Sequence, residues 1–121
     1  MRYSYLLGLI GVLFLAGCSA YKVSSIKPSE ASVDSRYEGR LYQISYKKAT
    51  DFDMVSDVCK KEAAKVSNDN KYEYFTFLDK KEDNAVFNGG KKTADVVYTV
   101  LLLNKEDLVN YRNYYKVSNY L

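Results

Sequence analysis

The sequence predicts a small α+β domain in which three strands and a helix follow the order β-α-β-β, with a second helix expected at the end. Side chains alternate between apolar and polar over residues 40–47, apolar residues recur at helical spacing over residues 50–67, and residues 94–103 are apolar on both faces towards their end. A strand that is apolar on both faces is typical of the middle of a sheet. We therefore expect an antiparallel three-stranded sheet with the third strand in the centre, which is the split β-α-β arrangement.

The first predicted helix, residues 50–67, carries a continuous apolar stripe. Thr50 is the expected N-cap, and Asp53 three residues later completes an approximate capping box. The stripe consists of Val55, Val58, Cys59, Ala63 and Val66. Because Cys59 lies in the middle of this stripe, we expect its thiol to be buried and unreactive.

Two strands are expected after this helix. Residues 71–79 are rich in aromatic side chains and predict the second strand, and residues 94–103 predict the third. The polar residues 80–92 between them contain Asn-Gly-Gly and predict a flexible loop.

The chain beyond the third strand predicts a second helix. Asn104 can cap it, and Leu108, Tyr111 and Tyr115 recur at helical spacing. One helix covers only one face of a sheet, and a large bare apolar face is uncommon on a soluble monomer. We therefore expect the C-terminal helix to cover the other face with these three side chains, and another protein is the alternative.

The N-terminus has the three parts of a secretory signal. Arg2 adds positive charge, residues 6–17 carry no charge, and small residues end the segment. Its twelve residues give about 18 Å of helix, which is short for a bilayer core of about 30 Å. Leu15-Ala16-Gly17-Cys18 resembles the lipobox of bacterial lipoproteins. The resemblance implies a diacylglyceryl group on the Cys18 sulfur and cleavage just before Cys18; a plain signal peptide with a chance cysteine and a short N-terminal anchor are the alternatives.

Cleavage at this point divides the chain into three parts. These are a signal peptide of residues 1–17, a lipid-anchored serine-rich tether of residues 18–37 and a small α+β domain of residues 38–121. The tether is expected to have little regular structure. Ser19 follows the cysteine, and resemblance to the lipoproteins of enteric bacteria implies that a residue other than Asp there favours the outer membrane. We expect a cell-envelope protein anchored in the outer membrane at its periplasmic face.

The composition removes the usual catalytic and metal-binding groups. The chain has no histidine, and lipidation of Cys18 leaves Cys59 as the single free thiol. Ser-His-Asp and Cys-His arrangements are therefore impossible, as is a zinc site of Cys and His. The net charge is only +3, and basic and acidic residues are interspersed, so the sequence predicts no concentrated basic face for nucleic acid. We expect no enzymatic activity, no cofactor, no metal ion and no nucleic-acid partner.

Acidic residues keep a wall-glycan hydrolase in view as an alternative. One group is expected at the start of the first helix and the other in the polar loop: Asp51, Asp53 and Asp57, and Asp79, Glu82 and Asp83. Two carboxylates held across a cleft can hydrolyse a glycosidic bond. The first group suits a helix N-terminus and the second lies among lysines, so we favour a structural role for both.

Tyrosine is the unusual component, with 13 residues in the chain. Tyrosines suit strands, and they also line glycan and protein surfaces. Tyr72 and Tyr74, on the less apolar face of the second strand, and Phe87 in the polar loop are the best candidates for an exposed interaction surface.

The function expected from the sequence is therefore an anchored envelope component. The runs "YQISYKK", "VCKKEAAK" and "YEYFTFLD" are similar to a family of small bacterial envelope lipoproteins of unknown function. We expect a non-enzymatic structural or interaction protein whose partner is an envelope protein or the cell wall. A glycan- or peptide-binding module of the cell wall is the alternative, and a small wall-glycan hydrolase is less favoured.

Overall fold

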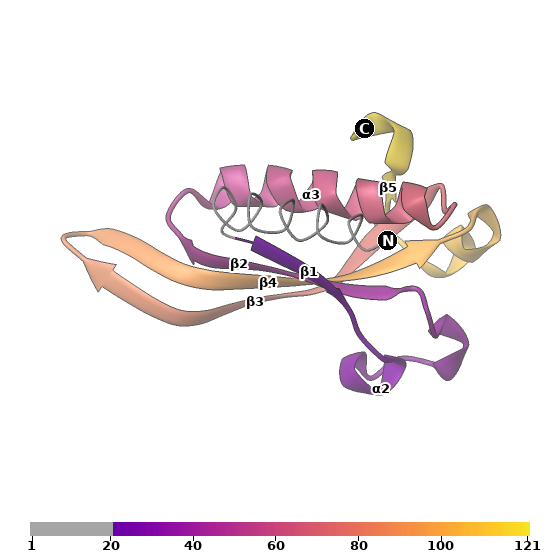
Figure 1. The fold of residues 1–121 in the computed structure, drawn as a ribbon, viewed down its shortest axis with the longest axis horizontal. Coiled ribbons are helices and arrows are strands. Elements are labelled where there is room, and N and C mark those ends of the chain that lie inside the picture. The colour runs from indigo at the N-terminus through magenta and orange to yellow at the C-terminus, as the bar shows by residue number, and fades with distance from the viewer. Residues whose placement is uncertain (1–20) are drawn as a thin grey trace, which may run out of the picture.

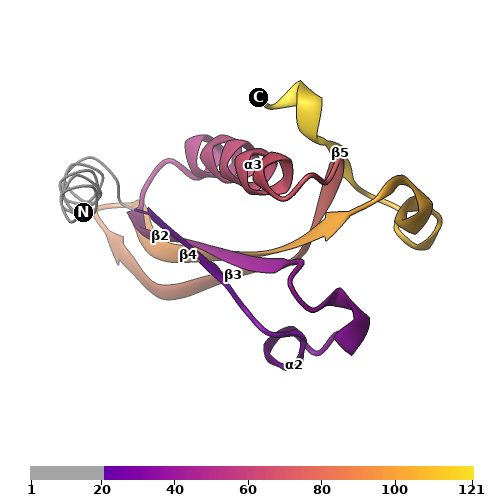
Figure 2. The ribbon, with the colours of Figure 1, turned by 45° about the vertical axis from the view of Figure 1, so that its right-hand side comes forward.

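A single antiparallel sheet of five strands, in the order β1-β2-β4-β3-β5, forms the centre of the molecule. The computed structural model describes residues 21–121. The strands are β1 (Tyr21–Ser25), β2 (Leu41–Ala49), β3 (Tyr74–Asn88), β4 (Lys91–Leu103) and β5 (Tyr115–Lys116). The long helix α3 (Phe52–Asp69) lies along one face, and the short helix α2 (Pro28–Ala31) lies on the opposite side (Figures 1 and 2). Three 3₁₀ turns complete the chain: η1 (Ser35–Tyr37), η2 (Lys105–Asn110) and η3 (Val117–Asn119).

The predicted three-stranded sheet is wrong, because a short strand lies at each edge in addition. β1 pairs with β2 from Tyr21 opposite Tyr46 to Ser25 opposite Tyr42. β5 adds only two residues, which pair with Tyr74 and Phe75 of β3. Such short edge strands have too few residues to show a period, so their sequences do not predict them.

Strand β1 also changes the picture of residues 19–35, which were expected to have little regular structure. From Tyr21 onwards this segment contains β1 and α2, and η1 follows at residue 35. Val23 packs against the core beneath α3, and the backbone amide of Ile26 donates to the carbonyl oxygen of Leu41 at 3.0 Å. Five residues of the expected tether are therefore part of the sheet.

Helix α3 begins one residue later than expected. Asp51, and not Thr50, is the N-cap, and its carboxylate accepts a hydrogen bond from the Met54 amide at 3.0 Å. Val55, Cys59 and Ala63 face the sheet and are at most 1% exposed. The small side chains on this face let the helix lie close to the strands.

Strands β3 and β4 form a hairpin longer than the one expected. Residues 80–88 belong to β3, so the predicted polar loop over 80–92 is wrong. A two-residue turn at Gly89 and Gly90, with φ angles of 62° and 81°, joins the strands. Two positive φ values suit the mirror-image turns that match strand twist, and glycine adopts them without steric cost. The hairpin end projects beyond α3 on the left of Figure 1.

The sheet has a hydrophobic core on each face. The core beneath α3 includes Ile44, Cys59, Phe75, Val100 and Leu102. The core on the opposite face contains Tyr37, Leu41, Leu101 and Leu103, all at most 5% exposed. β4 contributes alternate residues to both cores, which explains why its sequence is apolar without interruption.

The expected C-terminal helix is absent, and its residues divide between the two faces. Residues 105–110 form the 3₁₀ turn η2, which places Leu108 and Tyr111 against the opposite-face core. Tyr115 instead lies in β5 and packs beneath α3, with its ring centroid 5.2 Å from that of Phe75. Ile26, Ala31 and Val33 supply further cover for the opposite face.

Candidate functional site

The anchor residue predicted from the sequence, Cys18, lies outside the described residues. The structure describes the chain from Tyr21, three residues later. Tyr21 pairs with Tyr46 of β2, Tyr46 pairs with Val96 of β4, and Val96 pairs with Glu82 of β3. The first described residue therefore lies in one row across the sheet with the base of the projecting hairpin.

The end of this hairpin presents apolar side chains to solvent. We define the hairpin tip as residues 84–93. Phe87 is 72% exposed and Val86 is 58% exposed. Phe87 pairs with Lys92 and Val86 with Thr93, so the two apolar side chains lie on opposite faces of the ribbon.

Polar contacts fix the base of the hairpin. The Asp95 carboxylate accepts hydrogen bonds from the Lys48 amide and from the Asn84 side chain, each at 2.9 Å. These two bonds, with Lys47 Nζ at 3.7 Å, lower the pKa of Asp95 despite some desolvation. Asp95 thus ties β2 and β3 to β4 at the point where the hairpin leaves the sheet.

Lysine side chains accompany the hairpin. Lys92 donates a hydrogen bond to Glu82, and this bond is the main cause of the lowered pKa of the Glu82 carboxyl. The Lys92 ammonium also lies 5.2 Å from the centroid of the Phe52 ring. Lys80 Nζ lies 3.8 Å from the same carboxylate. Between residues 84 and 93 the sequence has two lysines, Lys91 and Lys92, and no acidic residue. Because Lys92 is paired with Glu82, Lys91 supplies the positive charge at the end of the hairpin.

Tyr72 and Tyr74 lie at the other end of β3. Tyr72 is half-buried and stacks with Arg40, whose guanidinium carbon is 5.2 Å from the ring centroid. Tyr74 is half-buried against the opposite-face core and meets Tyr114 edge-on, with ring centroids 5.7 Å apart. At about 3.3 Å per residue, the thirteen steps from Tyr74 to Phe87 span roughly 40 Å. The structure thus brings the two tyrosines near each other and places Phe87 far away.

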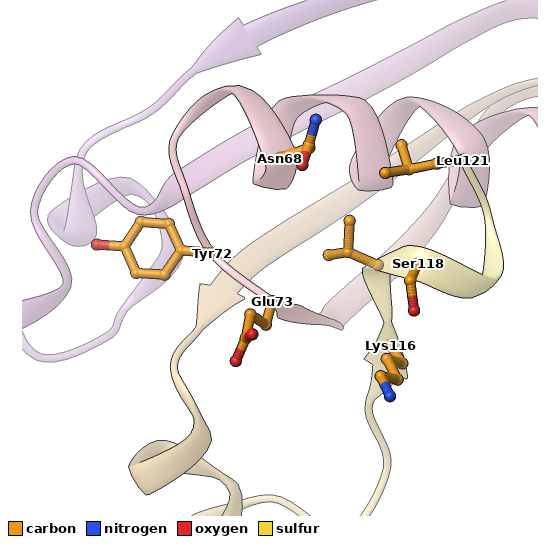
Figure 3. A pocket seen from close by; sticks show the side chains of 7 residues that line it. Asn68, Tyr72, Glu73, Lys116, Ser118 and Leu121 are labelled. Carbon is orange, nitrogen blue, oxygen red and sulfur yellow. The ribbon is translucent and has the colours of Figure 1, made fainter.

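A small cavity lies beside Tyr72. It has a volume of about 150 Å³ and is lined by Asn68, Tyr72, Glu73, Lys116, Val117, Ser118 and Leu121. Figure 3 shows the Tyr72 ring and the Leu121 side chain on opposite sides of this group. Pockets that enclose a small-molecule ligand hold about 300–1,000 Å³. This cavity can accept one side chain of a partner, but not a sugar chain.

Two of the six acidic residues considered for hydrolysis have structural partners. Asp51 caps α3, and Glu82 is paired with Lys80 and Lys92. Within residues 21–121, no three carboxylate, histidine or cysteine side chains lie together in a way that could hold a metal ion. The same part of the chain contains no helix with the length and apolar character needed to cross a membrane.

Several tyrosine hydroxyls serve the fold, which the sequence pattern did not indicate. The Tyr21 hydroxyl donates to Glu62 at 2.9 Å, and burial together with this bond raises the Tyr21 pKa to about 12. The Tyr111 hydroxyl donates to Tyr37 at 3.1 Å, and burial followed by this bond raises the Tyr111 pKa to about 12. Part of the tyrosine excess is therefore explained by hydrogen bonds that join segments far apart in the sequence.

Cys59 is buried, as predicted. Its side chain lies on the face of α3 that packs on the sheet and has no exposed surface. Desolvation, with a smaller contribution from Glu62, raises the pKa of the thiol to about 12. A thiol that keeps its proton is a poor nucleophile.

The chain matches no family model, and no curated protein or solved structure is similar to it at a significant level. The sequence motifs and the geometry of residues 21–121 therefore carry the functional argument by themselves.

Proposed function

We propose that this protein is a lipoprotein of the bacterial cell envelope, held in the outer membrane at its periplasmic face by lipid on Cys18. The observation that carries the proposal is Leu15-Ala16-Gly17-Cys18 at the end of an uncharged segment with a positive start. One acyl chain gives only marginal membrane binding, whereas two or more hold a protein stably. Lipid on Cys18 would therefore be the protein's durable attachment.

The role we propose for the anchored domain is structural or adaptor-like rather than catalytic. Asp51 and Glu82 are engaged in a helix cap and in ion pairs, and the chain contains no histidine to act as a general base. The cavity beside Tyr72 supports the second candidate, a module that binds a peptide through one inserted side chain. A wall-glycan hydrolase is the third and least favoured.

Metabolic labelling with a fatty-acid analogue tests the anchor. The wild-type protein should take up the label and remain with membranes after a carbonate wash, whereas Cys18→Ser should take up no label. The matched control is Cys59→Ser, which changes the chain's other cysteine and should keep the label. If Cys18→Ser is still labelled and still retained, lipid is attached elsewhere and the proposal is wrong.

Binding and turnover assays separate the three roles. Purified peptidoglycan and envelope extracts should capture the protein only if it binds a wall or protein partner, and Tyr72→Ala should weaken capture through the cavity while Tyr114→Ala should not. Release of soluble wall fragments by the wild type, lost in Asp→Asn variants at positions 51, 53, 79 or 83, would establish the hydrolase and overturn the non-catalytic role.

A further inference from the structure

We propose that the hairpin tip, residues 84–93, is a second membrane contact, which enters the headgroup region of the same bilayer that holds the Cys18 lipid. The inference rests on the proposed lipid anchor and deepens it, because it states which end of the domain faces the membrane. Strand direction, chain length, exposed apolar side chains and charge each contribute to it.

Strand direction points the anchor towards the hairpin. β2 runs towards Ala49, which pairs with Ala94 at the base of the hairpin. β1 is antiparallel to β2, so the chain reaches Tyr21 from the hairpin end of the sheet and runs away from it. The chain therefore enters the sheet at the end from which the hairpin projects.

Chain length keeps the anchor close to that end. Only Ser19 and Ala20 lie between Cys18 and Tyr21, and three residue steps span at most about 11 Å. From the row of Tyr21 and Val96, the five steps to Lys91 carry the hairpin about 17 Å further. With the strands end-on to the membrane, the turn of the hairpin therefore reaches at least about 6 Å past Cys18, since about 11 Å is the upper limit for the three steps. Apolar side chains enter a bilayer interface to a depth of about 5–10 Å, so the tip is long enough to reach it.

The side chains at the tip suit a lipid surface. Phe87 and Val86 are the apolar groups there, and both are mostly exposed to solvent. Lys91 adds a positive charge at the turn, which favours anionic headgroups, whereas Lys92 is already paired with Glu82. No residue between 21 and 121 pairs with the outer edge of β3 beyond the two positions that β5 covers, so we place the hairpin at a depth where water can reach its backbone groups.

The opposite end of the sheet provides an internal comparison. Val109 in η2 is 86% exposed, so it is at least as accessible as Phe87. It follows the end of β4 at Leu103, whereas the hairpin precedes the start of β4. An exposed apolar residue is therefore present at both ends, and the hairpin end is the one at which the chain enters β1.

A depth measurement on the lipidated full-length protein tests the inference. Phe87→Cys and Val109→Cys each receive an environment-sensitive fluorophore, and Cys59 stays unlabelled because it is buried. The proteins are placed in vesicles of phosphatidylethanolamine and phosphatidylglycerol that contain a headgroup-level spin-labelled lipid. We expect the probe at position 87 to be blue-shifted and quenched several-fold more strongly than the probe at 109. Asn88→Cys repeats the measurement at a neighbouring exposed position if labelling at 87 disturbs the fold.

The outcomes separate the two proposals. Retention of fatty-acid label together with equal or absent quenching at 87 and 109 overturns the hairpin contact and leaves the anchor intact. Stronger quenching at 109 also overturns it, because the opposite end then faces the bilayer. If Cys18 carries no lipid, the anchor proposal itself is wrong. Fatty-acid labelling shows this before any vesicle is prepared.

Discussion

Burial decides what the thiol of Cys59 can do. Cys59 lies between α3 and the sheet with no exposed surface, and its pKa is raised to about 12. We expect thiol reagents to modify the folded domain slowly and the denatured chain quickly. Cys59→Ala should lower the free energy of unfolding by about 1 kcal/mol, since it removes one buried sulfur from a packed site. Equally fast labelling of folded and denatured protein would contradict the burial.

The same residue predicts a pH dependence of stability. An acidic group whose pKa is raised by folding stabilises the folded state fully only below its unfolded value, here 9.0, and loses that contribution as the pH rises towards about 12. In this window the unfolded chain releases the Cys59 proton and the folded chain keeps it. Above pH 9.0 wild type loses about 1.4 kcal/mol per pH unit from this group. The advantage of wild type over Cys59→Ala, about 1 kcal/mol, should therefore begin to fall near about pH 8 and reverse before about pH 10.5, as measured by urea unfolding. A constant advantage would mean that folding does not change the pKa.

Two adjacent tyrosines near the C-terminus lie in different environments, and substituting each one tests their placement. Tyr115 packs beneath α3 against Phe75 and Phe77, with ring centroids 5.2 and 5.7 Å away, whereas Tyr114 is 43% exposed. Tyr115→Ala should cost about 2–3 kcal/mol, because it leaves a cavity beside two aromatic rings. Tyr114→Ala should cost less than about 1 kcal/mol. Chemical denaturation measures both, and equal losses would show that β5 does not set this alternation.

At the scale of elements, the hairpin tip should be separable from the cores. Replacing residues 87–92 with Asn-Gly joins Val86 to Thr93, which already face each other across the ribbon. The removed residues are exposed or nearly so, and none belongs to either core. We expect the free energy of unfolding to change by no more than about 1 kcal/mol.

The control for this excision is a core residue of the same hairpin. Leu101 lies in β4 and is fully buried, so Leu101→Ala should lower the free energy of unfolding by about 2–5 kcal/mol. If the excision costs as much as Leu101→Ala, the tip supports the fold, and its exposed apolar residues are not free to serve a second purpose.

The elements differ in how far their sequences could predict them. The range of α3 is close to the predicted one because its apolar stripe continues over the whole helix. β1 and β5 depend on pairing with strands that are distant in the sequence. With five and two residues, they are too short to show an alternation of apolar and polar side chains. The sequence predicts a loop for the hairpin because residues 80–84 are polar without alternation, as is usual in a strand with water on both faces. A hydrophobic pattern reveals which side chains are buried, so it does not reveal strands, such as these, whose side chains are largely exposed.

Candidate interaction residues were harder to place than the core. Tyr72, Tyr74 and Phe87 are close in sequence, but a single long strand carries Phe87 roughly 40 Å from the other two. Their grouping depended on the assumption that residue 80 begins a loop. Phe87 was recognisable because an aromatic residue among lysines and asparagines has no core to enter, and its exposure is as expected from that position.

At the scale of the whole molecule, the position of β1 determines how an anchored domain would sit on a membrane. A tether of seventeen flexible residues would span roughly 23 Å and allow any orientation. With β1 in the sheet, three residue steps separate Cys18 from a rigid element, and the domain would lie against the bilayer with its hairpin end nearest. This orientation therefore depends first on whether lipid is attached to Cys18.

Intact mass spectrometry of the protein isolated from bacterial membranes tests this central claim most directly. The account predicts a chain that begins at Cys18, with diacylglyceryl on the sulfur and an acyl group on the new amine, and a Cys18→Ser variant that keeps residues 1–17 and carries no lipid. A membrane-bound wild-type chain that begins at another residue, or that has an unmodified Cys18, would contradict the anchor and the orientation derived from it.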